Sequence, residues 1–526
     1  MNLPPVHLAI LQPAGYVHSL GFLDQARYFR HQFRRMGAEV TLAKNRLRED
    51  AVNFVFGAHL GFPVEWQRRH ACLFVNLEQL GHGGAKLNPD YLKLLRSSAV
   101  VDYDAANLAA YAQDPADVPL VPFLYAPYLA EPAPLPLEDR PIDLLFFGSL
   151  NPRRQAYLQR VEACGLQVAT FDHPLYGAER DHFVRQAKAV LNCHYYDSSR
   201  FEQARAFHCL SLGTPVISER GPRTEAPAAF DEAVFWLDDA GLAPFFTQQF
   251  NSPAYFEAAR AKLQAFTRHD PIEAYADLLA FAAGFHQAHG RTRAAGPWRP
   301  TQMNLGSGKD YKPGWLNVDI LARAEPDVVL DLGQPQQWPL QLPNLHGGEV
   351  LLEAGSLARV YANNVLEHVP DLPMLMGQVL ALLQEGGEFQ IEVPYEKSLT
   401  AWQDPTHLRA LNENSWLYYT DWFWYLGWFE HRFEVASSGW LDLKLQPCTQ
   451  AQAAFMKLTL RKVATTPRER TVARALRADF GGVPDDDVWA AAAEPGADDT
   501  PPSAASGIPE FPESAARPAE AQASPA

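Results

Sequence analysis

The sequence is poor in cysteine and has no long apolar run. Its 526 residues include five cysteines, without the spacing of a disulfide framework or of a metal-binding motif. No segment approaches the roughly eighteen apolar residues that a membrane-spanning helix needs. The start, MNLPPVHLAILQPAGY, lacks the basic segment and cleavage site of a signal peptide and is typical of a first β-strand. These absences exclude a disulfide scaffold and favour a cytoplasmic location.

An excess of positive charge is lacking too. The chain has 45 Lys and Arg against 61 Asp and Glu, a formal net charge of −16 at pH 7. Such a chain is a poor candidate for coating nucleic acid, so we expect no nucleic-acid partner. A local basic pocket can still hold a phosphate, and peripheral contact with a membrane stays open.

The composition is that of a globular protein, with 47% hydrophobic and 20% charged residues, and the length indicates two to four domains. Strand-like and helix-like segments alternate over the first 290 residues. VHLAILQP precedes the helical period of LDQARYFRHQFRRMG, and IDLLFFGSL restarts the pattern after a proline-rich segment at 129–141. Such alternation indicates parallel sheets covered on both faces. We predict two α/β lobes, at 1–130 and 131–290.

A linker at 291–300 leads to a third α/β unit, predicted at 301–463. Residues 464–526 pass from a short helix-like stretch into a segment rich in Pro, Ala and Ser, acidic and poor in aromatics. A segment of this kind cannot bury enough apolar surface to fold, so we expect most of this tail to be disordered.

A glycine turn opens the third unit, in MNLGSGKDYKPGWLNVDI. Gly306 and Gly308 follow the strand-like QMNL, where a Cβ would block a bound cofactor from the backbone. Asp319 ends the next strand-like segment, and its carboxylate can accept hydrogen bonds from both hydroxyls of a ribose. Two glycines and an aspartate are weak evidence alone, because surface turns often produce them. The strand-like segments PDVVLDLG, SLARVYANN and GGEFQIEVP, which follow in order, strengthen the interpretation.

Together, MNLGSG, GWLNVDI, VLEHV and GGEFQIEVP resemble class I S-adenosylmethionine-dependent methyltransferases of a small, type-11-like branch, over about Thr301–Val463. The resemblance implies S-adenosylmethionine as cofactor. In that family the glycine turn holds the methionine part, the acidic residue after the second strand binds the ribose, a further acidic residue approaches the adenine amine, and a polar residue after the fourth strand lies beside the methyl-transfer site. In this chain these residues are Gly306, Ser307 and Gly308, then Asp319, Asp331 and Asn364.

The spacing departs from the usual pattern of the family. Gly306 and Asp319 are only thirteen positions apart (319 − 306), so the helix between them must be short or missing. The third glycine of the usual pattern is absent. Both features recur in the small branch of the family, so they indicate which subfamily the segment resembles.

Methyl transfer is an in-line displacement, for which the protein supplies positioning and, for a hydroxyl acceptor, a base. His407, in WQDPTHLRALNENSW, is the first candidate base and His368, in LEHV, the second. His407 could instead be a loop histidine bonded to the backbone, and His368 and Glu367 could be structural residues at a helix start. The segment WLYYTDWFWYLGWF could stack on a sugar or lipid-linked acceptor, but is more typical of a packed core.

A second resemblance covers about residues 5–288. IDLLFFGSLNPRR and LYGAERDHFVRQAKAVLNCHYYDSSRFEQARAFHCLSLGTPVISERG are similar to bacterial glycosyltransferases of the two-lobed GT-B type, near those of surface-polysaccharide and spore-coat clusters. The resemblance implies a nucleotide-sugar in the second lobe and an acceptor in the cleft facing the first. The predicted fold is thus α/β throughout: two Rossmann-like lobes (GT-B), a Rossmann-like class I methyltransferase domain and a disordered tail.

The residues of the second lobe suit a nucleotide-sugar. Gly148 and Ser149 form a strand-end turn whose N–H groups can meet a diphosphate, which Arg153 or Arg154 can neutralise. Glu202 and Arg205 lie one helical turn apart on the helix that precedes GTPVISE. The resemblance implies that the carboxylate accepts hydrogen bonds from ribose or sugar hydroxyls and that the cation points toward the phosphates. The alternative is an ordinary surface ion pair.

Two histidines of the front half are further candidates. His18, on the first loop, is a candidate base, while His194 either lines the donor cleft or is a buried core residue. No Asp-x-Asp motif stands at a strand end in this half, so we expect a metal-independent mechanism and predict no metal ligands.

These observations predict a bifunctional enzyme of polysaccharide biosynthesis: a nucleotide-sugar-dependent glycosyltransferase fused to a methyltransferase that acts on a sugar hydroxyl. The acceptor would be a glycan or a lipid-linked saccharide. The alternative is an active methyltransferase carrying a GT-like module that only binds glycan or nucleotide-sugar. A scaffold of two dead folds is disfavoured, since a dead site has no physical need of Gly306, Gly308 and Asp319 together.

Overall fold

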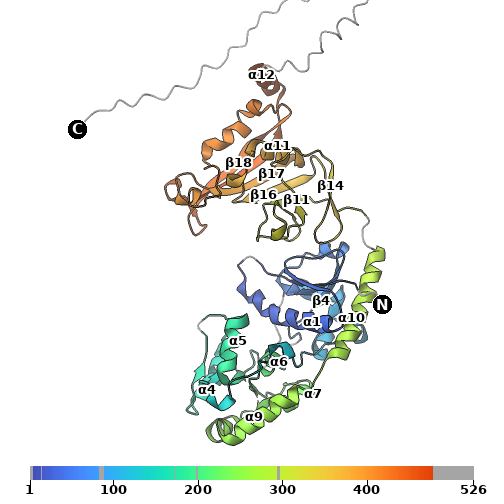
Figure 1. Ribbon diagram of the computed structural model, residues 1–526, viewed down its shortest axis with the longest axis vertical. Helices are drawn as coiled ribbons and strands as arrows, with labels where there is room; N and C mark the ends of the chain where they lie inside the picture. Colours follow the sequence, from blue (N-terminus) through green and yellow to red (C-terminus); the bar gives the residue numbers. More distant parts are fainter. Residues whose placement is uncertain are drawn as a thin grey trace, which may run out of the picture.

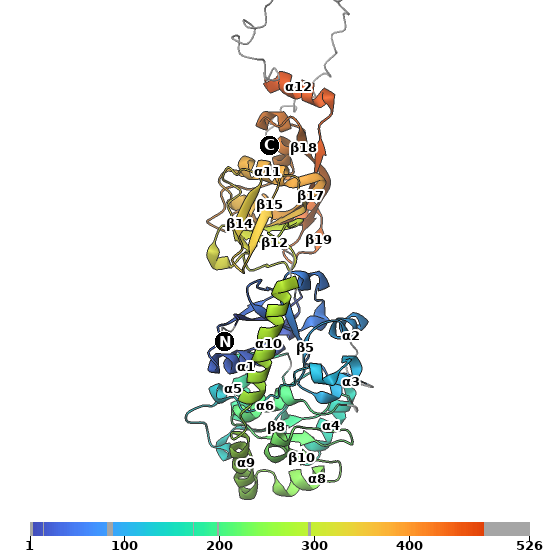
Figure 2. The ribbon, with the colours of Figure 1, turned by 90° about the vertical axis from the view of Figure 1, so that its right-hand side faces the viewer.

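The computed structural model describes residues 4–13, 15–81, 88–171, 173–196, 199–292 and 296–477. Figures 1 and 2 show three α/β units along the long axis of the molecule, with the first lobe between the second lobe and the third unit. The predicted disordered tail from residue 478 on, and residues 293–295 of the predicted linker, lie outside the described residues. Within the described ranges no helix is both long and apolar enough to cross a membrane.

The first lobe is built on a parallel five-stranded sheet in the order β2-β1-β3-β4-β5. VHLAI and VNFVF form its fully buried strands β1 and β3, as continuous apolar runs do in a sheet covered on both faces. The strand order reverses between these two strands, which is where ligands bind in open α/β sheets. The strands are β1 Val6–Ile10, β2 Val40–Lys44, β3 Val52–Phe56, β4 Ala71–Val75 and β5 Val100–Val101, and the helices are α1 Leu23–Arg35, α2 Pro89–Arg96 and α3 Leu108–Tyr111.

The second lobe repeats this layout with a parallel sheet in the order β10-β9-β8-β6-β7. Its order reverses between β6 and β8, so the loops after these two strands form the corresponding ligand position. The strands are β6 Ile142–Leu145, β7 Val168–Ala169, β8 Ala187–Asn192, β9 Val216–Glu219 and β10 Phe235–Leu237. The helices are α4 Pro152–Glu162, α5 Gly177–Gln186, α6 Gln203–Ser211, α7 Ala228–Ala233, α8 Leu242–Pro244 and α9 Pro253–Phe266.

The two lobes share one hydrophobic core. Helix α10 (Ile272–Thr292) leaves the second lobe and lies along the first, beside α1 and β4 (Figure 2). The ring of Tyr28 in α1 packs 4.9 Å from Phe207 in α6 and 5.7 Å from Tyr275 in α10, measured between ring centroids. The lobes are therefore packed together, and a site between them is formed by both.

The third unit contains an eight-stranded sheet in the order β13-β12-β11-β16-β17-β20-β18-β19. Strands β13 to β17 of this sheet are parallel and follow the 3-2-1-4-5 order of dinucleotide-binding sheets, reversing between β11 and β16, whereas β20 runs antiparallel. The strands are β11 Gln302–Leu305, β12 Leu316–Asp319, β13 Val328–Val329, β16 Leu357–Asn363, β17 Leu383–Pro394, β18 His431–Leu441, β19 Pro447–Cys448 and β20 Phe455–Ala464. A hairpin of β14 Leu340–Pro343 and β15 Glu349–Leu352, and helices α11 Leu372–Leu382 and α12 Pro467–Arg477, complete the unit.

The predicted fold class, two Rossmann-like lobes followed by a third Rossmann-like unit, is confirmed by these sheets. Residues 306–315, all of them described, form turns without a helix, as the short distance from Gly306 to Asp319 predicts. The sequence predicts that the strand of PDVVLDLG ends in Asp331, but β13 ends at Val329, so Asp331 follows the strand.

The third unit contacts the first lobe. Arg46 pairs with Glu325, and the backbone N–H of Glu49 donates to the carbonyl of His346 at 2.9 Å. The two halves of the chain are thus in direct contact.

Candidate functional site

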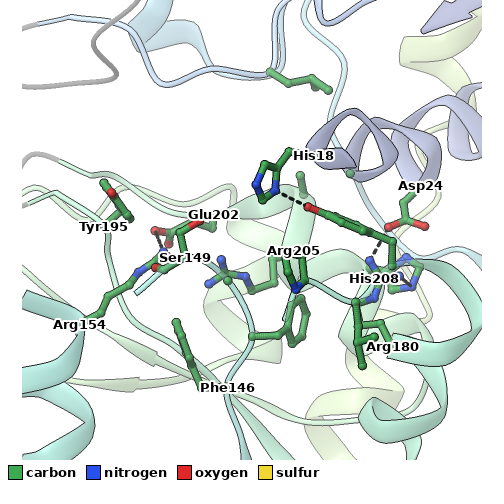
Figure 3. Close-up of a pocket in the computed structure, with 18 of the residues that line it drawn as sticks. His18, Asp24, Phe146, Ser149, Arg154, Arg180, Tyr195, Glu202, Arg205 and His208 are labelled. Atoms are coloured by element: carbon green, nitrogen blue, oxygen red, sulfur yellow. Dashed lines mark hydrogen bonds and ion pairs between the residues drawn. The ribbon is translucent and has the colours of Figure 1, made fainter. Parts of the chain in front are cut away.

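A cavity of about 640 Å³ lies between the two front lobes. The first lobe contributes His18 and Asp24, and the second contributes the residues that follow β6 and β8. Figure 3 shows Arg154, Ser149 and Glu202 at one end and Asp24, Arg180 and His208 at the other. The cavity lies at the strand-order reversal of the second sheet, which is the expected ligand position of that lobe, and the first lobe lines it with segments that follow β1, β4 and β5. The sequence-predicted residues that line it are His18, Gly148, Ser149, Arg154, Glu202 and Arg205.

Two arginines meet at the glycine turn after β6. A Cβ on Gly148, which has φ +130°, would lie 2.8 Å from Nη2 of Arg205 and 3.3 Å from Nη1 of Arg154. Arg154 also donates to the Ser149 carbonyl at 2.9 Å. Burial, together with the neighbouring positive charge of Arg205, lowers the pKa of Arg154 to about 10. Two guanidinium groups this close to one backbone turn favour an anion between them.

Glu202 is turned inward instead of forming a surface ion pair. Its side chain is 18% exposed and accepts a hydrogen bond from Asn192 at 2.9 Å, while Nδ1 of His194 lies 3.1 Å away. Arg205 donates to the Oδ1 of the same Asn192 at 3.0 Å. Burial would raise the pKa of Glu202, but the hydrogen bond and charge of His194 and the charge of Arg205 outweigh it and lower the pKa to about 2. The group is a carboxylate available to hydroxyl donors.

The structure decides between the alternatives that the sequence left open for Arg153, Arg154 and His194 in the second lobe. Arg153 pairs with both oxygens of Glu219, at 2.9 Å for Nη1, and the cavity wall as described does not include it, so Arg154 is the arginine that faces the cavity. His194 is 1% exposed, and its Nε2 lies 3.0 Å from Thr224 Oγ1. It is therefore a buried residue that orients Glu202.

Polar contacts cross the cavity from lobe to lobe. Nδ1 of His18 lies 2.7 Å from the hydroxyl of Tyr176 in the second lobe. Arg180, in α5, donates to Asp24 of α1 at 2.6 Å, and both side chains are only 7% exposed. Arg180 also contacts Asp181, within the same buried group. A buried ion pair of this kind ties the lobes together, because separating it leaves charges unpaired.

The glycine turn of the third unit is bonded to the predicted ribose-binding aspartate. The N–H of Gly308 donates to Oδ2 of Asp319 at 2.9 Å, and the N–H of Leu321 donates to Oδ1, also at 2.9 Å. Gly306 and Gly308 have φ of +63° and +47°, and a Cβ on Gly306 would collide with Val365, which follows β16. The turn is thereby packed against the strand-order reversal of its sheet.

The other predicted cofactor residues surround the same sheet edge. Ser307 is 3% exposed, and its Oγ has no hydrogen-bond partner among the described residues. Asn364 follows β16 and has a positive φ of +51°. Non-glycine residues rarely adopt this conformation, and those that do are concentrated at functional sites. Asp331 is exposed and accepts from the N–H of Gly333 at 2.8 Å.

The two candidate bases of the third unit lie together. The ring centroids of His368 and His407 are 4.7 Å apart, and Nε2 of His407 is 4.0 Å from Oε1 of Glu367. Nδ1 of His407 lies 2.9 Å from the carbonyl of Ala401, which is the backbone bond considered for a purely structural histidine. The structure therefore gives this residue both a backbone bond and a second nitrogen that faces Glu367.

The aromatic segment of the third unit is divided between core and surface. Trp416, Tyr419 and Phe423 are buried. Three other aromatic residues of the segment are exposed: Tyr418 by 41%, Trp422 by 46% and Tyr425 by 57%. The core interpretation therefore holds for part of the segment, and the other rings are exposed at the surface.

Comparisons with known proteins give few matches in sequence and many in fold. No protein-family model matches the chain. An uncharacterized protein of Acanthamoeba polyphaga mimivirus is 27% identical over 133 residues, which are 25% of this chain and 42% of that protein, so the chain spans less than half of that relative.

The solved structures that are similar belong to both expected classes. WaaG, a glycosyltransferase involved in lipopolysaccharide biosynthesis, is 10% identical, with 53% of this chain and 100% of that chain covered and a TM-score of 0.35. TarM is 9% identical over 45% of this chain and 55% of its own, with a TM-score of 0.33. An S-adenosylmethionine-dependent methyltransferase from Mesorhizobium loti is 15% identical, with 31% of this chain and 93% of that chain covered and a TM-score of 0.21. The two-part resemblance agrees with these neighbours, which concern the fold alone and assign no activity.

Several residues of the cavity escaped the sequence analysis. Asp24 and Arg180 lie within helices, where charged residues are ordinary, and they are 156 positions apart. Glu78 also lines the cavity, and burial raises the pKa of its carboxyl group. No local pattern in the sequence distinguishes these residues, because their neighbours come from the other lobe or from distant loops.

Proposed function

We propose that the chain is a bifunctional glycan-modifying enzyme, which transfers a sugar from a nucleotide-sugar in the front cavity and a methyl group to a sugar hydroxyl in the third unit. The acceptor would be a glycan or a lipid-linked saccharide of polysaccharide biosynthesis, modified in the cytoplasm. The observation that carries the proposal is the approach of Arg154 and Arg205 to the Gly148 turn inside a cavity made by both lobes.

In the front half, the diphosphate of the donor would lie between the two guanidinium groups and the N–H groups of the Gly148 turn. Glu202 would accept hydrogen bonds from ribose or sugar hydroxyls. An acceptor hydroxyl forms the new bond to the anomeric carbon as the bond from that carbon to the diphosphate oxygen breaks. The nucleoside diphosphate leaves with the electron pair, stabilised by the arginines, and the hydroxyl proton passes to a base. His18, which Tyr176 holds at the opposite wall, is the candidate for that base.

In the third unit, S-adenosylmethionine fits the residues present. Ser307 Oγ is buried without a hydrogen-bond partner in the described part of the chain, and the N–H of Gly308 donates to Asp319, so this backbone turn has polar groups available on one side. When bound, S-adenosylmethionine supplies a methyl group to the acceptor oxygen as the carbon–sulfur bond breaks, S-adenosylhomocysteine is left, and the hydroxyl proton is released. Asp319 would accept from the ribose, Asp331 would approach the adenine amine, and Asn364 would border the acceptor side.

An alternative function keeps the methyltransferase and makes the front half a binding module. The observation that favours it is the pair of contacts across the cavity, Arg180 with Asp24 and His18 with Tyr176, because they restrain the opening that substrate exchange needs.

Release of nucleotide from a donor separates the two functions. The full chain would be incubated with UDP-glucose, UDP-N-acetylglucosamine and GDP-mannose, alone and with simple sugar acceptors, and free UDP or GDP would be measured. Transfer predicts release that Arg205→Ala removes and Arg160→Ala, an exposed arginine of the same lobe, leaves intact. Binding of UDP or GDP by calorimetry without any release would support the binding module instead.

A further inference from the structure

Glu367 is a buried acid to which no other described residue donates a hydrogen bond. Its side chain is 2% exposed, and neither carboxylate oxygen has a partner within the described part of the chain. Leaving such a group unpaired is costly, typically by about 1–3 kcal/mol and more for a charge. A buried carboxyl group in this state needs either a proton or a cation close by.

Two histidines lie beside this carboxylate, and the hydrogen bonds of their Nδ1 atoms indicate which ring nitrogen carries the hydrogen. Nδ1 of His407 lies 2.9 Å from the Ala401 carbonyl. Nδ1 of His368 lies 3.0 Å from the hydroxyl and 3.2 Å from the carbonyl of Thr406, and that hydroxyl donates its hydrogen to Asp404 at 2.7 Å. A carbonyl oxygen only accepts, so Nδ1 of each ring carries the hydrogen and Nε2 keeps its lone pair in the neutral imidazole. Metal-binding histidines characteristically donate their second nitrogen in this way, which fixes the tautomer and the ring.

The backbone holds the two segments that carry these side chains together. The N–H of Leu408 donates to the carbonyl of Glu367 at 2.8 Å, which places His407 beside the short helical turn Leu366–His368. One potential ligand atom from each of the three side chains lies within 4.8 Å of the other two. Tetrahedral ligands at about 2.1 Å from a zinc ion are about 3.4 Å apart, so a modest inward rotation of the side chains completes a site.

We propose that Glu367, His368 and His407 bind one divalent transition-metal ion, of the zinc type, beside the methyl-transfer site. Two imidazoles and one carboxylate favour such an ion over magnesium or calcium, which prefer oxygen ligands alone. The sequence predicted no metal here, because the three residues form no recognised spacing.

The position of the cluster suggests its role, and this part rests on the proposed methyl transfer. Val365, two residues before Glu367, packs against the Gly306 turn. An ion at the cluster would therefore lie on the acceptor side, with a coordination position open for the acceptor hydroxyl. Bound there, the hydroxyl has a lowered pKa and loses its proton to solvent, and its oxygen then forms the bond to the methyl carbon as the carbon–sulfur bond breaks.

The test is a metal titration of the full chain after removal of bound metal with a chelator. We expect one equivalent of Zn²⁺ by calorimetry, d–d absorption bands on addition of Co²⁺, and no comparable binding of Mg²⁺. Glu367→Gln and His407→Gln should each weaken Zn²⁺ binding by about 100-fold or more. His431→Gln, a histidine of β18 outside the cluster, is the matched control and should bind as the wild type does.

The wild-type titration tests the proposal even if a variant fails to fold. Absence of stoichiometric Zn²⁺ and Co²⁺ binding to the wild type overturns the proposal, and a proton on Glu367 then explains its burial. Unchanged binding in both Glu367→Gln and His407→Gln also overturns it. Titration of the same samples with S-adenosylhomocysteine separates the two ideas. Cofactor binding without a metal site leaves the methyltransferase and removes the ion, whereas Zn²⁺ binding without cofactor binding leaves the ion and removes the methyltransferase.

Discussion

Nη2 of Arg205 lies 2.8 Å from the point that a Cβ on Gly148 would occupy. The guanidinium can reach the backbone turn only because residue 148 is glycine, and Arg154 uses the same space from the other side, at 3.3 Å. Two positive groups are thus held against each other by the wall of the cavity. An anion bound between them would relieve that repulsion, which is why the turn is central to the proposed donor site.

Gly148→Ala should weaken UDP binding about tenfold or more, because the new methyl group displaces Arg205 from the turn. The substitution also places alanine at φ +130°, so backbone strain needs its own control. Gly165→Ala provides it: Gly165 has φ +89° in the same lobe, and a Cβ there meets nothing within 4 Å. Calorimetry with UDP on both variants checks the prediction, and equal losses of affinity in the two would contradict it.

Arg180→Met should destabilise the front half strongly, by about 3–5 kcal/mol, because Asp24 would remain buried without its cation, whereas Asp181 would keep His208 at 2.8 Å. Arg160→Met is the matched control. Arg160 pairs with Asp239 at the surface, where both side chains are at least 46% exposed, and such pairs contribute about 1 kcal/mol or less. Urea unfolding followed by tryptophan fluorescence measures both, and similar midpoints for the two variants would show that the lobes do not depend on the buried pair.

Glu202 should make the front half sensitive to acid. Its pKa falls from an ordinary 4.5 to about 2 in the folded chain, because the contacts with His194 and Arg205 outweigh the effect of burial. A folded pKa below the unfolded one means that the carboxylate stabilises fully above about pH 4.5 and that this contribution is lost as the pH falls through about 2.

Compared with Glu202→Gln, which does not titrate, the wild type should be more stable near neutral pH, by about 3 kcal/mol at most. The difference should shrink as the pH is lowered from about 5 to about 3. Urea midpoints of both proteins across this range test the prediction. A gap that stays constant with pH would mean that the Glu202 carboxylate is not held by these partners.

Features set by neighbouring residues were predictable from the sequence. Gly148, Gly306 and Asp319 stand at strand ends, and strand ends and glycine turns are encoded in a few consecutive residues. The adjacent pair Arg153 and Arg154 shows the limit. Both stand at the start of α4, and only the orientation of that helix against β8 and β9 sends one to Glu219 and the other into the cavity.

Features set by distant contacts were not predictable. The pairing of Arg180 with Asp24 depends on how the two lobes pack, and no local pattern carries that information. Glu367 is similar: LEHV is compatible with an ordinary helix start, and the sequence does not show that the acid is buried without a hydrogen-bond donor while His407 arrives from a loop forty positions later (407 − 367).

The most direct test of the central claim, an S-adenosylmethionine site built on the Gly306 turn, is calorimetric titration of the full chain with S-adenosylhomocysteine. We predict binding at about micromolar affinity that Asp319→Ala abolishes. Asp442→Ala is the matched control, since Asp442 likewise accepts two backbone N–H groups, from Lys444 and Gln446, but in the turn between β18 and β19. Absence of binding to the wild type, or equal binding by Asp319→Ala, would contradict the account.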